Sequence, residues 1–198
     1  MGKDLIGRVQ RLLLSPASEW DAIDKETSDM AAIYKNYVGP LVIASAVAGM
    51  IGMIVFGVGF GFGININIRM SPFTALTNAV VTIVLSLAMV YILALIIDAL
   101  APTFGAQKNF GQAFKVAAYA PTAGWVGGLL QIIPALGIIG ALFGLYSLYL
   151  LFVGLPKLMK PAADKGAIYT VAVIVCAIVL AIVVRALTAP MMDRGMFF

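Results

Sequence analysis

Three ionisable residues border long uncharged stretches and are the groups best placed for chemistry at a membrane. They are Asp98, Lys115 and Arg185. Ionisable groups at membrane depth are costly and commonly functional. Asp98 and Lys115 flank one short loop, so they could pair across it, and Arg185 can extend its guanidinium group to the lipid headgroups. We interpret the three as anchoring and pairing residues, with a role in transport or signalling as the alternative.

Other chemistry is nearly absent from the sequence. There is no histidine, which excludes Ser-His triads and His-ligated metals. The one cysteine, Cys176, cannot form an intrachain disulfide. The chain also lacks the HExxH, GxSxG, P-loop and CxxC motifs. We therefore expect a protein that is not an enzyme and has no catalytic residues, no cofactor and no metal site.

The composition is that of a membrane protein. Of the 198 residues, 62% are hydrophobic and 11% are charged, whereas a soluble domain is about 25% charged. So few charged residues cannot cover the surface of a soluble fold of this size. The net charge of +4 is spread among loops and forms no single patch, which argues against nucleic acid as a partner. The expected partner is the lipid bilayer.

Charge-free runs set the expected number of membrane crossings, because a helix needs about 20 apolar residues to cross roughly 30 Å. These runs cover residues 36–68, 70–97 and 116–156. The last run would reach roughly 60 Å as one helix, so it must hold two helices joined by a turn at Pro134 and Gly137. A further apolar stretch toward the C-terminus supplies one more helix. The sequence therefore predicts an all-α fold, a polytopic bundle of five transmembrane helices, at about 41–64, 74–100, 114–133, 138–155 and 168–187.

Small residues recur at four-residue spacing in several of these spans. The pairs are Gly57 and Gly61, Gly59 and Gly63, Gly124 and Gly128, and Gly140 and Gly144. Such spacing lets helix backbones approach closely. Packing within one molecule is the ordinary interpretation, and a homodimer interface is the alternative.

The distribution of Lys and Arg predicts the orientation. Ten of the thirteen fall in the N-terminal segment or in the connections near residues 108–115 and 157–165, and three fall on the other side of the predicted spans. By the positive-inside rule the N-terminus is cytoplasmic and the C-terminus external. We expect the protein to lie in a bacterial cytoplasmic (inner) membrane.

Residues 1–39 form the expected cytoplasmic part, before a transmembrane domain over residues 40–198. Apolar residues fall at helical spacing at Leu5, Ile6, Val9, Leu12 and Leu13. This pattern predicts an amphipathic helix on the cytoplasmic leaflet.

A second helix should start at Ser15-Pro16, with Trp20 and Ile23 on one face. The rest of that helix is acidic, at Glu19, Asp21, Asp24 and Glu26. Its apolar face could pack under the bundle or dock a partner protein.

Several motifs in order along the chain are similar to those of the Yip family of Ypt/Rab-interacting proteins, in particular its bacterial inner-membrane branch. The residues that carry the resemblance, with their neighbours, are Glu19, Trp20, Glu26, Gly39, Pro40, Tyr119, Pro121 and Tyr146. The resemblance implies five transmembrane helices and a cytoplasmic N-terminal region. Eukaryotic members bind prenylated Rab-type GTPases and one another. This chain departs from the eukaryotic pattern at Asn36, where that pattern has an aspartate, and from many bacterial relatives at Ala106, where they often have glycine.

Two functions remain open from the sequence. The first is a non-enzymatic protein that organises membrane or partner proteins. The second is a small channel or transporter for an ion or small solute. The glycine-rich first span and the charged residues Asp98 and Lys115 favour it, as do polar residues such as Ser86, Tyr119 and Thr122. If the chain is bacterial, Rab binding cannot be its function.

Overall fold

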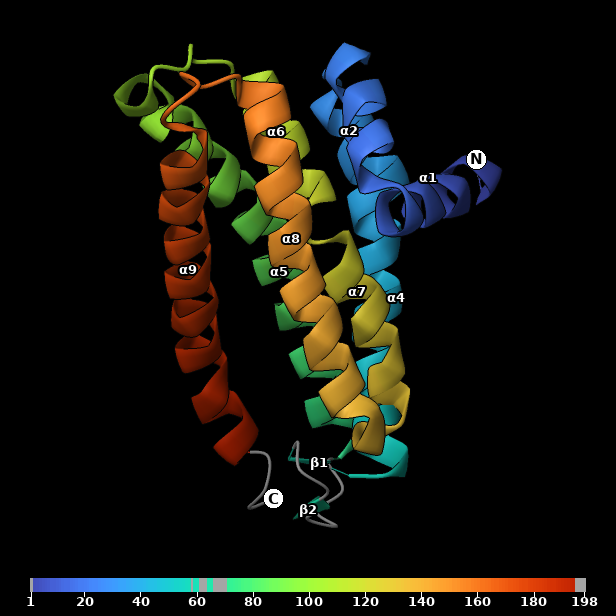
Figure 1. The fold of residues 1–198 in the computed structure, drawn as a ribbon. Coiled ribbons are helices and arrows are strands. Elements are labelled where there is room, and N and C mark those ends of the chain that lie inside the picture. The colour runs from blue at the N-terminus through green and yellow to red at the C-terminus, as the bar shows by residue number, and fades with distance from the viewer. Residues whose placement is uncertain (1, 58, 61–63, 66–70, 195–198) are drawn as a thin grey trace.

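The computed structural model describes residues 2–57, 59–60, 64–65 and 71–194, which form helices and one short hairpin (Figure 1). The first part contains α1 (Gly2–Leu14), α2 (Pro16–Lys25), α3 (Met30–Ile33), the π-helical turn η1 (Tyr34–Val38), α4 (Gly39–Val55), and the antiparallel strands β1 (Gly59–Phe60) and β2 (Ile64–Asn65). The second part contains α5 (Pro72–Leu100), η2 (Ala101–Phe104), α6 (Phe110–Tyr119), α7 (Thr122–Leu129), η3 (Leu130–Ile132), η4 (Pro134–Leu136), α8 (Gly137–Met159) and α9 (Gly166–Arg194).

Within the described ranges, four helical stretches are long and apolar enough to cross a membrane. They are Met30–Val55, Pro72–Phe104, Gly137–Met159 and Gly166–Val184. These stretches correspond to the first, second, fourth and fifth expected spans, and they make the chain an all-α integral membrane protein. The first span is shorter than expected. α4 ends at Val55 because Gly57 turns the chain with a φ of 84°, and much of 58–64 lies outside the described residues.

The expected third span, 114–133, is not one continuous helix. α6 ends at Tyr119 and α7 begins at Thr122, so the break falls at Ala120-Pro121. Proline has no N–H to continue the helical hydrogen bonds, and its ring clashes with the preceding turn. The Thr122 hydroxyl donates to the carbonyl of Tyr119 (2.6 Å) and satisfies an acceptor that the break would leave free. Neither piece alone is long enough to cross a bilayer, so the four long helices do not establish the count of five.

The long helices run the length of the molecule, with the N-terminal helices at one end and β1–β2 at the other (Figure 1). α7 packs between α4 and α8, and α9 lies against α5 and α8. Glycines allow the close approach of α7. A Cβ on Gly127 would meet Phe143 of α8, and one on Gly128 would meet Ser45 of α4. Gly128 of the predicted pair therefore serves packing within one molecule, whereas Gly61 and Gly63 lie outside the described residues.

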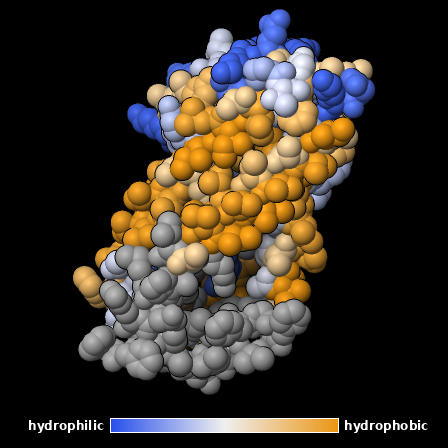
Figure 2. Space-filling model, turned by 90° about the vertical axis from the view of Figure 1, so that its left-hand side faces the viewer, coloured by the Kyte–Doolittle hydropathy of each residue, from blue (hydrophilic) through white to orange (hydrophobic). Residues whose placement is uncertain are grey.

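The outer surface divides into an apolar flank and one polar end. Figure 2 shows hydrophilic residues gathered at that end and a broad hydrophobic band below it. Large exposed apolar side chains of the flank include Val80, Val84, Leu142, Leu145, Val175 and Ile182. Such a surface suits lipid and would be a liability in water. We call the end built from α1, α2 and the connections 101–109 and 160–165 the polar end.

The amphipathic helix α1 lies across the polar end, but its apolar face is turned inward. Leu12 is fully buried in the hydrophobic core, and Leu5 and Val9 pack against that core. The bundle therefore covers Leu12 completely and Leu5 and Val9 in part, so much of this apolar face packs on protein. Ile6 and Leu14 remain exposed on other faces of the helix.

Candidate functional site at the polar end

The anchor of the polar end is Trp20 of α2. Its side chain is fully buried against α8, where Gly154 leaves room for the indole ring. A Cβ at Gly154 would overlap that ring. The rings of Trp20 and Tyr119 also pack in a T-shaped arrangement, with centroids 6.4 Å apart and planes at 79°. Trp20 and Ile23 are thus packed under the bundle, and their buried side chains are not exposed for docking a partner.

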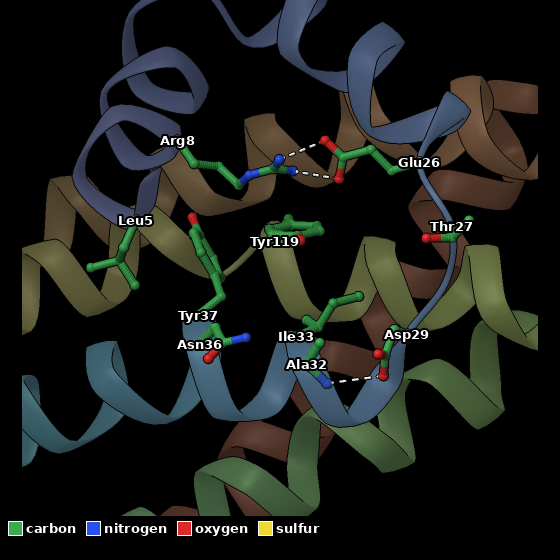
Figure 3. Close-up of a pocket in the computed structure, with 10 residues that line it drawn as sticks. All are labelled: Leu5, Arg8, Glu26, Thr27, Asp29, Ala32, Ile33, Asn36, Tyr37 and Tyr119. Atoms are coloured by element: carbon green, nitrogen blue, oxygen red, sulfur yellow. Dashed lines mark hydrogen bonds and ion pairs between the residues drawn. The ribbon is translucent and has the colours of Figure 1, made fainter. Parts of the chain in front are cut away.

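Two bidentate ion pairs join α1 to the α2 region. Arg11 donates to both carboxylate oxygens of Glu19, at 2.6 and 3.2 Å, and Glu19 is 4% exposed. Arg8 donates to both oxygens of Glu26, at 2.9 and 2.5 Å, and also stands over the ring of Tyr119 at 5.3 Å (Figure 3). Paired forks of this kind fix geometry as well as adding attraction. Burial alone would lower the pKa of Arg8, but its bond to Glu26 and the nearby Tyr119 and Glu19 raise that pKa overall, so Arg8 stays cationic.

Lys115 of α6 holds the other end of α2. Its side chain is 1% exposed, and its ammonium group donates to the backbone carbonyls of Ile23 (2.9 Å) and Glu26. The last carbonyls of a helix lack partners within the helix and carry partial negative charge, so a buried cation is favourable there. Lys115 is therefore one of the residues that tie the end of α2 to the bundle.

The predicted ion pair between Asp98 and Lys115 does not form. Lys115 faces α2, and no ion pair links it to Asp98 in the described part of the chain. One carboxylate oxygen of Asp98 is buried and, among the described residues, has no hydrogen-bond partner. The neighbouring carbonyl of Ile97 accepts from the Tyr169 hydroxyl of α9. The side chain of Arg185 lies outside the described residues.

Further contacts tie the N-terminal helices to α8 and to the connection that follows it, and sequence reasoning missed them. Lys157 pairs with Asp21 (2.6 Å), and Lys160 pairs with Asp24 (2.8 Å). The Tyr146 hydroxyl of α8 donates to the carbonyl of Leu13 (2.8 Å). The sequence signal for these contacts is the basic segment 157–165, which has an acidic helix as its counterpart.

The Gly39-Pro40 motif has a local structural cause. Pro40 lacks the N–H that would continue the α-helix, and the N–H of Gly39 instead bonds to the carbonyl of Tyr34, which makes the wider π turn. A Cβ on Gly39 would lie 2.9 Å from that carbonyl oxygen. The turn places the Tyr37 hydroxyl 2.8 Å from the hydroxyl of Thr122, at the helix break beside Pro121. These polar groups are engaged in packing.

A cavity of about 820 Å³ opens between α1 and the start of the first long helix. Figure 3 shows its walls: Leu5 and Arg8 come from α1, and Asp29 comes from the linker after α2. Buried Tyr37 and Tyr119 also line it. Its volume falls in the range of small-molecule sites, and its lining combines charged, aromatic and apolar groups.

These features define a class: a polytopic helical membrane protein whose N-terminal helices are locked onto one end of its bundle. Within that class the chain belongs to the Yip1 domain family, whose family model matches residues 11–184. This is a family of non-enzymatic membrane proteins. No curated protein and no solved structure matches the chain significantly.

Proposed function

We propose that this Yip1-family protein is a non-enzymatic organiser of the membrane, which presents the outer face of α1 and α2 to a partner membrane protein. The observation that carries the proposal is the number of independent ties that hold those helices. Trp20, Lys115 and the pair of Arg11 with Glu19 each fix them by a different kind of contact. Fixing a surface in advance lowers the cost of ordering it when a partner binds.

Two of the polar residues that favoured a channel, Tyr119 and Thr122, are better explained by packing. Thr122 bonds to Tyr37 and to the carbonyl of Tyr119, so these groups stabilise a helix break. The same contacts support the organising role over transport, because a conducting path needs polar groups that face water or an ion.

The fifth crossing forms part of the proposal. α6 and α7 together cover residues 110–129, about 30 Å of helix at 1.5 Å per residue. They follow α5 and precede α8, and α7 packs between α4 and α8. Broken helices are tolerated in membranes where neighbouring protein satisfies the freed backbone. We infer five crossings, with a cytoplasmic N-terminus and an external C-terminus in a bacterial cytoplasmic membrane.

This topology predicts opposite locations for two reporters. A reporter fused after Phe198 should be external, and one inserted near Lys160 should be cytoplasmic, because α9 crosses once between them. Alkaline phosphatase and green fluorescent protein fusions give the two readouts. Finding the Phe198 fusion on the cytoplasmic side would show that α6 and α7 do not complete a crossing.

The organising role can be tested by photocrosslinking in the native membrane. A photoreactive amino acid replaces Ala22, which is exposed on α2, or Ala163, which is exposed in the connection 160–165 at the same end. We expect one discrete adduct with a membrane protein at position 22 and none at position 163. Identical adducts at both positions, or none at either, would contradict a docking face on α2. Ion or solute flux through vesicles that hold only the purified protein would instead support a channel.

A further inference from the structure

The cavity beside α1 has walls of both charge signs and a partly aromatic floor. Arg8 and Glu26 pair across it, Asp29 lies on the linker side, and the buried side chains of Tyr37 and Tyr119 line its base (Figure 3). Two carboxylates against one guanidinium leave an excess of negative charge. A cationic group is the complement of such a lining. Tyrosine faces also attract cations, although the face of Tyr119 already carries Arg8.

Asp29 is the carboxylate best able to receive that cation. One of its oxygens accepts from the N–H of Ala32 (3.0 Å). Within the described residues, it forms no ion pair with a basic side chain. Glu26, by contrast, has both oxygens occupied by Arg8.

The mouth of the cavity leads onto a surface that suits hydrocarbon. Asn36 is exposed and lines the cavity, and it begins a row of exposed residues along the first long helix. The row continues through Pro40, Ile43, Val47 and Ile51, at spacings of three and four residues. Such spacing places side chains on one face of a helix. An amphiphile could therefore set its head in the cavity and its chain along α4.

We propose that the cavity binds the headgroup of an ethanolamine phospholipid, with the ammonium against Asp29 and the aromatic floor and an acyl chain along Ile43, Val47 and Ile51. A primary ammonium has three N–H donors for a carboxylate, whereas the trimethylammonium of choline has none. The site therefore distinguishes ethanolamine from choline by hydrogen bonding. Lipid binding in this place does not depend on a protein partner, so it can fail or succeed independently of the organising role.

The test uses the purified full chain in phosphatidylcholine nanodiscs that contain a small fraction of a photoactivatable probe lipid. The probe is phosphatidylethanolamine or phosphatidylcholine with a diazirine on the acyl chain. We expect the ethanolamine probe to label α4 near Ile43–Ile51 about tenfold more than the choline probe, a ratio typical of one charged hydrogen bond. Equal labelling by the two probes would overturn the proposal.

Two matched variants locate the effect. Asp29→Asn removes the charge but keeps an oxygen for the N–H of Ala32, and Asp164→Asn removes an exposed carboxylate at the same end of the molecule. We expect Asp29→Asn to abolish the preference for ethanolamine, with unchanged thermal unfolding, and Asp164→Asn to retain it. If both variants lost the preference for ethanolamine equally, the preference would come from the general surface charge and not from Asp29. Labelling displaced by a soluble lysine-rich peptide and not by excess phosphatidylethanolamine would assign the cavity to a basic protein segment instead.

Discussion

Gly154→Val is expected to force α2 away from α8 and to lower the free energy of unfolding by about 3 kcal/mol. The Cβ of any side chain at this position would overlap the indole ring of Trp20, which is fully buried and cannot swing into solvent. Overpacking a filled core typically costs 1–3 kcal/mol, and the cost rises when the neighbour cannot move. Unfolding in mixed detergent micelles, titrated with dodecyl sulfate, measures the change.

The same helix provides the control. Gly144 has nothing within 4 Å of where its Cβ would lie, so Gly144→Val should leave the unfolding free energy nearly unchanged. Trp20→Ala alone should cost about 3–5 kcal/mol, as for other buried aromatic truncations. In the Gly154→Val background it should cost much less, because the two residues share one contact. If the losses of unfolding free energy from Gly154→Val and Trp20→Ala were additive, the Trp20–Gly154 contact would not be what holds α2.

The membrane class and most of the helices could be predicted from the sequence, because they depend on composition and on the lengths of uncharged runs. The turn at Pro134 is one example. A single helix over that run would be twice the thickness of a bilayer core, and the structure breaks it there, with α8 beginning at Gly137. Helix ends at glycine do not follow from the lengths of uncharged runs. Gly57 ends the first long helix early, and no charge marks that position.

At Pro121, the length of the uncharged run leads to a wrong prediction of one continuous helix. The run that contains it is uncharged and long enough to cross, so it was predicted to be one helix, although the proline rule applies to Pro121 as it does to Pro134. The structure breaks this run at Ala120-Pro121 and satisfies the freed carbonyl of Tyr119 with the hydroxyl of Thr122. A threonine directly after a proline in a predicted span was the available clue.

Which way a side chain faces could not be predicted at the polar end. The apolar stripe Leu5, Val9 and Leu12 has the spacing of a lipid-bound helix, and the same spacing serves a helix packed on protein. Loop spacing placed Asp98 and Lys115 at one boundary, but Lys115 turns to the carbonyls at the end of α2. Both outcomes depend on where α1 and α2 fold back, which local sequence does not specify.

Lys115 therefore has a physical role different from the one that its spacing from Asp98 indicated. Burying an ammonium group is costly, and replacing a buried ion pair with apolar groups is often neutral or stabilising. The balance differs for Lys115, because its partners are backbone carbonyls that remain when the side chain is removed. When the side chain is removed, the carbonyl of Ile23 still accepts from the N–H of Glu26 (3.2 Å). The carbonyl of Glu26, however, loses the donor that Lys115 provides.

Lys115→Met keeps the length of the side chain and removes its charge and its N–H donors. We expect the unfolding free energy to fall by about 2–3 kcal/mol, the range for hydrogen bonds to charged groups. We also expect faster proteolysis of the linker 26–29, because the carbonyl of Glu26 at its start is no longer held by Lys115. Lys108→Met removes an exposed charge from the same end and should change neither measurement.

Asp98→Asn combined with Lys115→Met should give additive losses of unfolding free energy, because the two side chains are not paired. A strong coupling between positions 98 and 115 would contradict this assignment and restore the ion pair that the loop spacing indicated.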